Sequence, residues 1–180
     1  KNYSDRIQTN WMACTDGHFS CSPTIKAEGV HPSISIEESV TRVGRQAQQT
    51  MQKQLTTRLQ ILLGSYRQQR EYAQFSADLS EKTKDILRRG EIAETLIRQE
   101  PYRPITADVQ VLLLGLLFTD FFENQNVDYV IKNREILIET ISHHDAFKQL
   151  RTAAHETVVY DEFIHDLSQT HVVLKQVCQQ

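Results

Sequence analysis

The spacing of apolar positions changes along the chain and divides it into two parts. From Val43 onward, apolar residues recur every three or four positions, which is typical of amphipathic helices. Before that point no helical stripe is visible, and Ile34 and Ile36 alternate with serines as in a short strand. We therefore expect residues 1–44 to form strands and loops and residues 45–180 to form an all-helical bundle.

The helical part begins with a long amphipathic helix. Its apolar face is formed by residues spaced three and four apart: Leu55, Leu59, Leu62, Leu63 and Tyr66. Gly64 lies on this helix and predicts a bend or a close contact with another helix. Ser80 followed by Glu81 predicts the next helix start, because a serine hydroxyl can accept a free backbone N–H there. Two arginines followed by Gly90 predict the end of that helix.

Further helices are expected after Gly90. A short one should cover residues 91–99 and end before the prolines that follow. Thr106 and Asn126 should cap the next two, the first of which contains the apolar run 109–118. The second presents one face made of Val127, Val130, Ile131, Arg134, Ile138 and Ile141, which Ile136 and Leu137 widen. With a last helix from about Val158, the expected fold class is mainly α, a helical bundle preceded by a short partial β segment.

The composition is that of a globular protein and argues against two kinds of partner. Hydrophobic residues make up 39% of the chain and charged residues 24%, which is ordinary for a folded domain. The net charge is −3 and the basic residues are dispersed, so we expect no nucleic-acid-binding surface. The longest apolar run, 111–118, is far shorter than the roughly 20 residues of a membrane-spanning helix. Direct membrane insertion is therefore not expected.

No motif for independent catalysis is present. The sequence contains no GxxxxGK[ST] to hold a triphosphate, and neither GxGxxG nor GxSxG. Five of the seven histidines lie in the C-terminal third, but without HExxH or a pair four residues apart, so no metal site is expected. The three cysteines have irregular spacing, and we expect free thiols.

A compact polar group precedes the first long helix. It consists of Glu37, Glu38, Ser39 and Arg42. By composition alone this pattern is typical of a helix cap supplied by Glu38 or Ser39. A functional interpretation needs more information than the spacing of these residues.

That information comes from five blocks that resemble, in order, the α subunits of F-type ATP synthases. The blocks are Thr15-Asp16-Gly17-His18 (TDGQ in the family), Ser39-Val40-Thr41-Arg42-Val43-Gly44 (SVSRVG), Ala47-Gln48 with Met51, Tyr66-Arg67 with Tyr72-Ala73-Gln74-Phe75, and Arg89-Gly90 with Leu96, Gln99, Tyr102 and Pro104. They follow one another without insertions, which makes the set more specific than any single block. The resemblance covers about the first 120 residues, and beyond them it is limited to helical character.

The resemblance implies the C-terminal part of the non-catalytic, regulatory α subunit. Residues 1–44 would be the remnant of its nucleotide-binding domain and residues 45–180 its C-terminal helical domain. Because the chain begins at Lys1 within this region, we expect a fragment of a longer subunit. The resemblance also implies that Arg42 is an arginine finger, which reaches the neighbouring β subunit and stabilises the charge of the phosphoryl group in transfer. Ser39, Thr41 and the turn 15–17 would hold the loop that carries it.

A second nucleotide site, which does not turn over its nucleotide, is also implied by the resemblance. The family gathers the adenine between an Arg-Pro pair and two glutamines. The corresponding residues here are His31 and Pro32, then Gln99 and Pro101. Gln99 is kept, whereas Pro101 has neither a side-chain donor nor a backbone N–H. A serine of the family is also replaced, by Ala13. These departures indicate a divergent member with an altered adenine pocket.

The activity of the family completes the expectation. F-type ATP synthases couple rotary ATP synthesis or hydrolysis to proton or sodium transport, so the β and γ subunits are the expected partners. ATP or ADP with Mg²⁺ is the expected cofactor of the full complex, at the cytoplasmic face of the membrane. Alone, the chain should bind no cofactor and hydrolyse no ATP, because it lacks a P-loop.

Isolated, the chain should leave its first 44 residues disordered or pairing with another copy, as a homo-oligomer. One alternative is a stand-alone helical interaction module derived from such a subunit. The other is an independent metal- or nucleotide-dependent enzyme, which no motif supports.

Overall fold

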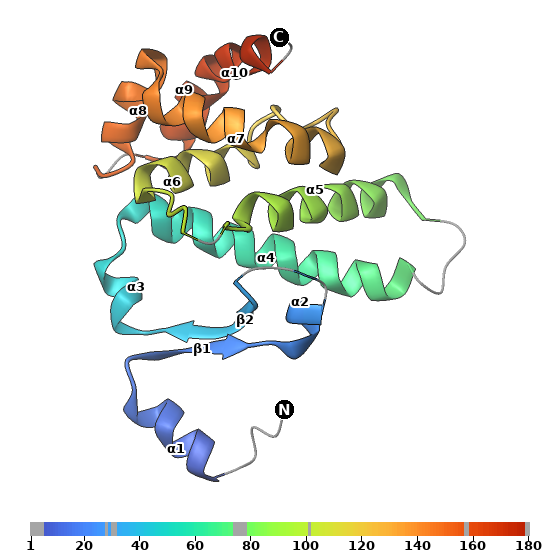
Figure 1. Ribbon diagram of the computed structural model, residues 1–180, viewed down its shortest axis with the longest axis vertical. Helices are drawn as coiled ribbons and strands as arrows, with labels where there is room; N and C mark the ends of the chain where they lie inside the picture. Colours follow the sequence, from blue (N-terminus) through green and yellow to red (C-terminus); the bar gives the residue numbers. More distant parts are fainter. Residues whose placement is uncertain are drawn as a thin grey trace. The chain divides into compact units, whose positions relative to one another are not determined.

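The computed structural model describes residues 6–27, 29, 32–73, 79–100, 102–156 and 159–178. The fold is mainly α, as the sequence predicts. The chain divides into two compact units, Lys1–Gln48 and Gln49–Gln180, whose elements are labelled in Figure 1. None of the described helices combines the length and the apolar character needed to cross a membrane.

The first unit contains a pair of strands and three short helices among its described residues. In chain order these are α1 (Arg6–Cys14), β1 (Gly17–Cys21), α2 (Pro23–Ala27), β2 (Ile34–Thr41) and α3 (Val43–Ala47). The strand predicted at Ile34 is confirmed. The prediction of strands and loops alone is wrong, because α1 and α2 are helical. Helix α1 buries none of its residues, so it lacks the core-facing stripe on which sequence periodicity depends.

Strands β1 and β2 pair antiparallel, but their register changes in the middle. His18 pairs with Val40, whereas Ser20 pairs with Ser35. Residues 36–39 of β2 therefore lie opposite the single residue between His18 and Ser20. This insertion is a large β-bulge, which bends a strand and redirects the side chains that follow it. It lies a few residues before Arg42.

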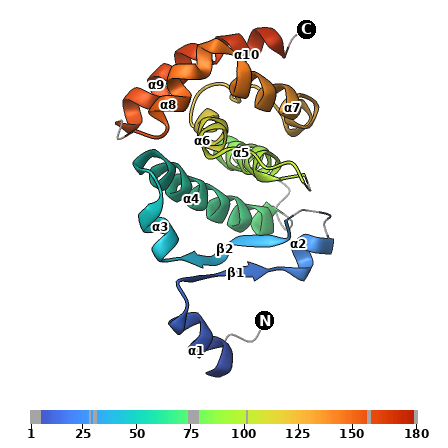
Figure 2. The ribbon, with the colours of Figure 1, turned by 60° about the vertical axis from the view of Figure 1, so that its left-hand side comes forward.

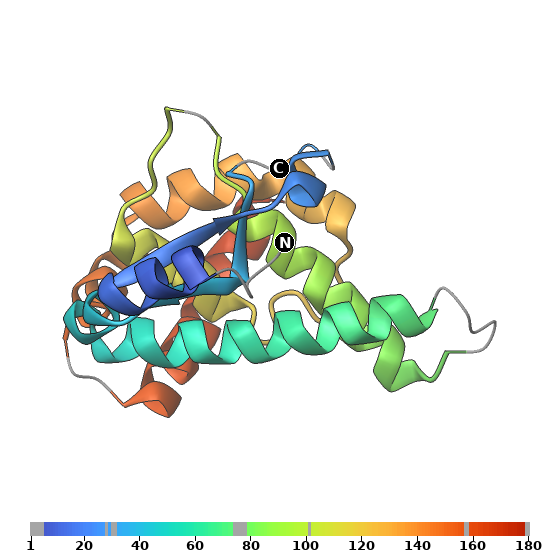
Figure 3. The ribbon, with the colours of Figure 1, turned by 90° about the horizontal axis from the view of Figure 1, so that it is seen from below.

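The second unit is a helical bundle. Its elements are α4 (Thr50–Ala73), α5 (Glu81–Ile97), α6 (Ala107–Leu116), α7 (Val127–His143), η1 (Asp145–Phe147), α8 (Lys148–Ala153), α9 (Tyr160–Thr170) and α10 (Val172–Val177). Helices α4 and α5 lie side by side (Figure 3). Helix α6 lies between α4 on one side and α8 and α9 on the other (Figure 2). The bundle is therefore built in layers around α6.

The core of the bundle is centred on α6. Six of its ten residues are buried, namely Val109, Val111, Leu112, Leu113, Gly115 and Leu116. A helix that is apolar nearly all round must be covered by neighbours on most sides, and α6 contacts α4, α5, α7, α8 and α9. The predicted apolar face of α4 is confirmed for Leu55, Leu59, Leu63 and Tyr66, which are buried, while Leu62 is half-buried.

Helix α5 continues through Gly90, so the predicted helix end there is wrong. Gly90 is buried, and a Cβ atom at this position would lie 2.2 Å from Cγ of Tyr66 on α4. The glycine is therefore needed for close approach of two helices. Burial raises the pKa of the Tyr66 phenol to about 12, with a smaller contribution from the negative charge of Glu94. The close contact expected at Gly64 is absent, since nothing described lies within 4 Å of its Cβ position.

The two arginines before Gly90 bind a loop instead of ending a helix. Arg89 Nη2 donates to the carbonyl of Leu117 at 2.7 Å. Arg88 Nη1 donates to the carbonyls of Phe122 and Gln125, the latter at 3.0 Å. These bonds satisfy backbone acceptors between α6 and α7, which have no strand or helix partner. The arginines therefore attach the α6–α7 loop to α5.

Two predicted helix starts are confirmed by capping hydrogen bonds. Ser80 Oγ accepts from the backbone N–H of Thr83 at 3.2 Å, and Asn126 Oδ1 accepts from that of Tyr129 at 3.0 Å. Thr106 precedes α6 as expected, but its side chain makes no capping hydrogen bond. Both confirmed caps are local contacts, so they can be recognised from the order of residues alone.

The predicted face of α7 is confirmed at Val130, Leu137 and Ile141 and is wrong at Ile131. The buried residues are Val130, Asn133, Leu137 and Ile141. Ile131 was placed on the inner face and is 61% exposed. The predicted last helix is divided into α9 and α10, and its expected start at Val158 lies outside the described residues.

We expect Gly90→Ala to lower the free energy of unfolding by about 1–3 kcal/mol, because the added methyl group overlaps the Tyr66 ring. The matched control is Gly64→Ala on α4, which should raise the free energy of unfolding by about 0.5–1 kcal/mol, since alanine favours a helix and nothing blocks its side chain. Urea denaturation followed by circular dichroism measures both. Similar shifts in the two variants would contradict the close packing assigned to Gly90.

His171, where α9 meets α10, predicts a loss of stability in acid. Its side chain is 3% exposed, and its Nδ1 atom has no hydrogen-bond partner among the described residues. Burial lowers its pKa below the ordinary value of 6.5, and Lys175 acts in the same direction, against the attraction of Asp120 at 3.7 Å. The unfolded chain thus takes up a proton at higher pH than the folded chain does.

The free energy of unfolding should therefore fall as the pH drops below about 6.5. In His171→Leu this pH dependence should be reduced, whereas His165→Leu at an exposed position of α9 should keep it. Denaturation at a series of pH values between 7.5 and 5 measures the slope. An unchanged slope in His171→Leu would show that other groups cause it.

Candidate functional site

Arg42 lies at a turn from strand to helix. It follows the last residue of β2 and precedes α3. Its backbone N–H donates to the carbonyl of Asp16 at 2.9 Å, and that of Val43 donates to the same oxygen at 3.4 Å. Gly17, which follows Asp16, lies so close to β2 that a Cβ atom at this position would be 2.5 Å from the Val40 carbonyl oxygen. The turn 15–17 therefore holds the backbone of Arg42.

Serine side chains stabilise the bulge before Arg42. Ser39 Oγ accepts from the backbone N–H of Ser20 at 3.0 Å and donates to the carbonyl of Ser35 at 2.5 Å. Ser20 Oγ donates to the carboxylate of Glu38 at 2.7 Å. These bonds take the place of strand-to-strand bonds that the bulge interrupts. Glu38 and Ser39 lie within β2, so the prediction that one of them caps a helix is wrong.

The guanidinium of Arg42 contacts the end of α1. Nη2 donates to the carbonyl of Met12 at 2.8 Å, and Nη1 donates to that of Ala13 at 3.3 Å. Both carbonyls belong to the last turn of α1, where helix carbonyls lack partners within the helix and attract cations. Only the backbone of Ala13 takes part, so the replacement of a family serine by Ala13 leaves this contact possible. The Arg42 side chain is exposed otherwise.

The residues expected at the adenine are not gathered within one unit. His31 and Pro101 lie outside the described residues. Pro32 is exposed in the first unit, and Gln99 is exposed in the second, just after α5. A pocket that joins Pro32 and Gln99 thus stays a prediction.

The segment that carries Gln99 is an exposed loop between α5 and α6 (Figure 3). The backbone N–H of Arg103 donates to the carbonyl of Glu100 at 3.3 Å, which closes a four-residue turn. Tyr102, the third residue of that turn, has a φ of 65° and a fully exposed side chain. A positive φ at this position is usual for glycine or asparagine and is strained for tyrosine.

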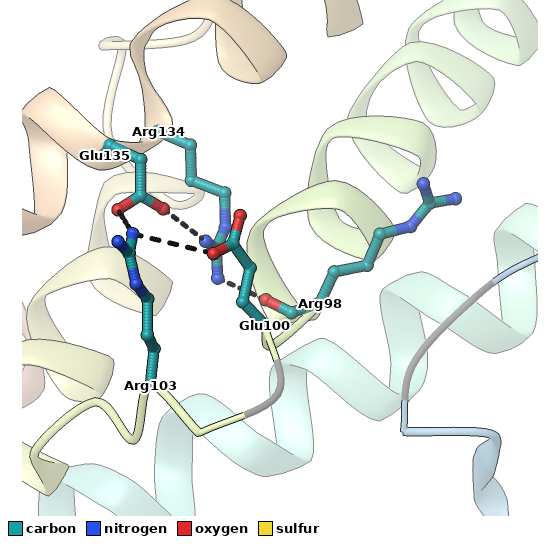
Figure 4. Close-up of polar contacts among 5 residues, drawn as sticks. All are labelled: Arg98, Glu100, Arg103, Arg134 and Glu135. Carbon is teal, nitrogen blue, oxygen red and sulfur yellow. Dashed lines mark hydrogen bonds and ion pairs between the residues drawn. The ribbon is translucent and has the colours of Figure 1, made fainter.

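Charged side chains attach this loop to α7 (Figure 4). Arg134 Nη2 donates to the carbonyl of Arg98, and Arg134 Nη1 lies 3.2 Å from Glu135 Oε1. Glu135 Oε2 lies 3.3 Å from Nη1 of Arg103, which is also 3.6 Å from the carboxylate of Glu100. Sequence reasoning gave these residues no function. The only signal was the position of Arg134 on a face of α7 that was otherwise apolar.

No group of three or more metal-ligating side chains is found in the described part of the chain. Cys14, Cys21 and Cys178 are free thiols. Burial raises the pKa of the Cys178 thiol, against a hydrogen bond with Tyr129, and so favours the protonated form.

Comparison with known proteins identifies the relatives of this chain. Residues 48–172 match the family described as the ATP synthase alpha/beta chain, C terminal domain. The chain belongs to this family. The match covers most of the bundle and extends beyond the first 120 residues over which the resemblance was traced.

Individual proteins that resemble this chain have names that agree with the family match. The ATP synthase subunit alpha of Clostridium botulinum is 31% identical over 172 residues, which are 95% of this chain and 34% of that protein. The subunit alpha of Streptococcus mutans is 32% identical over 148 residues, 81% of this chain and 30% of its own length. The subunit alpha of Lawsonia intracellularis is 33% identical over 135 residues, which are 75% of this chain and 27% of that protein. The chain spans about a third of the length of these curated relatives.

The strained turn after α5 predicts an unusual effect of glycine. Tyr102→Gly should raise the free energy of unfolding by about 0.5–1 kcal/mol, because a positive φ costs glycine little and no packing is lost. Tyr72→Gly, at an exposed position of α4, should lower it by about 1 kcal/mol, as glycine does within helices. Urea denaturation compares the two. A loss of stability in Tyr102→Gly would contradict strain at this turn.

Proposed function

We propose that this chain is the C-terminal part of the non-catalytic α subunit of an F-type ATP synthase. In that complex, ATP synthesis or hydrolysis is coupled to the transport of H⁺ or Na⁺. Relatives named ATP synthase subunit alpha, and the family match over residues 48–172, support this assignment. The observation that carries it is the anchored backbone of Arg42 in a block that resembles the family's SVSRVG element.

Within the complex, Arg42 acts in trans on the catalytic site of the neighbouring β subunit. Phosphoryl transfer spreads negative charge over the transferred group, and a fixed guanidinium lowers the energy of that state. The Asp16 carbonyl fixes the Arg42 backbone, and two bonds to the end of α1 orient its guanidinium. Lysine would not replace it, because an ammonium group lacks the planar fork that binds two oxygens at once.

Exposed apolar side chains in the first unit support a role within a complex. Ile7, Trp11, Phe19, Val40 and Val43 are between 42% and 80% exposed. Large exposed apolar side chains are often found at protein interaction surfaces. The β and γ subunits are the proposed partners, and the proposed location is the peripheral head of the complex at the cytoplasmic face of the membrane.

The chain also contributes to a nucleotide site that does not turn over its nucleotide. In this proposal His31, Pro32 and Gln99 are the residues for the adenine of ATP or ADP, which is bound with Mg²⁺ in the full complex. The amide of Gln99 supplies both a donor and an acceptor, which suits the edge of a purine base. Its exposed position after α5 leaves it accessible to such a ligand.

We expect Arg42→Ala to reduce steady-state ATP hydrolysis of the reassembled complex by about a thousandfold or more. Arg42→Lys should restore little of this rate, because the point charge is kept but the fork is lost. The matched control is Arg45→Ala, on the next helix of the same segment, which should keep most of the rate. Normal assembly with normal hydrolysis in Arg42→Ala would rule out the arginine-finger role.

A further inference from the structure

Arg134 is the most enclosed charged group at the α5–α6 loop. Its side chain is only 12% exposed, whereas those of Arg103 and Glu135 are 69% and 51% exposed. Exposed ion pairs contribute little to stability, because water screens them and two long side chains must be ordered. A charge-assisted hydrogen bond from an enclosed guanidinium to a carbonyl is stronger. The bond from Arg134 to Arg98 therefore dominates the attachment shown in Figure 4.

This bond acts at a sensitive point of the backbone. The Arg98 carbonyl is part of the peptide group that leads directly into Gln99, and α5 has already ended at Ile97. Beyond Gln99 the chain enters the turn with the strained residue Tyr102. Strained conformations persist only where surrounding contacts enforce them, and they concentrate at ligand-binding segments. The hydrogen bond from Arg134 on α7 thus fixes a loop whose exposed residues have little packing of their own to hold it.

Placing the Arg134 guanidinium at this position costs free energy. Its Nε–H group is buried without a hydrogen-bond partner among the described residues. Burying an unpaired donor is unfavourable, so an arginine at this position serves poorly as a packing residue. From this position the Arg134 side chain extends from α7 to the end of α5, and these two helices contact each other.

We propose that Arg134 is a positioning residue for Gln99, with Glu135 and Arg103 as outer support. It holds the backbone before Gln99 so that the amide is presented to the adenine in a single orientation, which reduces the entropy lost on binding. This inference rests on the proposed role of Gln99 in nucleotide binding. It makes α7 a structural link between the helical bundle and the non-catalytic nucleotide.

The first test measures the loop without any nucleotide. Amide hydrogen exchange of the 98–103 segment is compared in the 180-residue chain for wild type, Arg134→Met and Arg134→Lys. Lys132→Met is the matched control, because it removes one positive charge from an exposed position of the same helix. We expect exchange in the loop to rise on the order of tenfold in Arg134→Met, to be partly restored in Arg134→Lys, and to stay unchanged in Lys132→Met. Unchanged exchange in Arg134→Met, with the bundle folded by circular dichroism, would overturn the inference.

The second test measures ADP binding to the non-catalytic sites of the assembled complex. Gln99→Ala and Arg134→Met should each weaken ADP binding several-fold, with partial rescue in Arg134→Lys and no effect of Lys132→Met. If Gln99→Ala leaves ADP affinity unchanged, the proposed nucleotide role of Gln99 is wrong, whatever the loop does. If Gln99→Ala weakens binding but Arg134→Met does not, the positioning role of Arg134 is wrong while the proposed function stands.

Discussion

Burial of helix α6 is the constraint on which the bundle depends. Most of its residues are apolar and inaccessible, so α4, α5, α7, α8 and α9 must all pack against it. The loops that enter and leave α6 are then confined to the ends of this packed helix. Both are fastened by arginines: Arg134 binds the segment before α6, and Arg88 and Arg89 bind the segment after it. Apolar packing thus places the helices, and guanidinium groups fix the connections.

The first unit relies on a different principle. Few of its described residues are buried, and its arrangement near Arg42 is held by hydrogen bonds of serines, a carboxylate and backbone carbonyls. Such contacts are directional, so they can fix one residue accurately without a large core. A bulge in β2 shifts the register, and the Asp16 carbonyl then receives the N–H of Arg42. This local scaffold fixes the backbone of Arg42, which the proposed arginine-finger role requires.

Features that depend on near neighbours in the chain were predictable. The caps at Ser80 and Asn126 and the apolar face of α4 follow from residues within a turn or two of one another. The strand at Ile34 and the strand-to-helix position of Arg42 belong to the same class. Helix α1 was missed because it is exposed and carries no stripe toward a core. On α7 the buried positions Val130, Leu137 and Ile141 were predicted, whereas Ile131 and Ile136 were placed on the same face and are exposed, because an apolar side chain does not have to face the core.

The sequence by itself determined the helical class, the two-part organisation of its apolar pattern and the block that contains Arg42. Each of these is set by residue type and short-range spacing. Only the tertiary structure decided the meaning of Gly90, which looks like a helix end in the sequence and is a contact with Tyr66 in the fold. It also decided the partner of Arg134, since the Arg98 carbonyl lies 36 positions earlier in the chain. Contacts between distant segments depend on how helices pack, and local spacing carries no record of that packing.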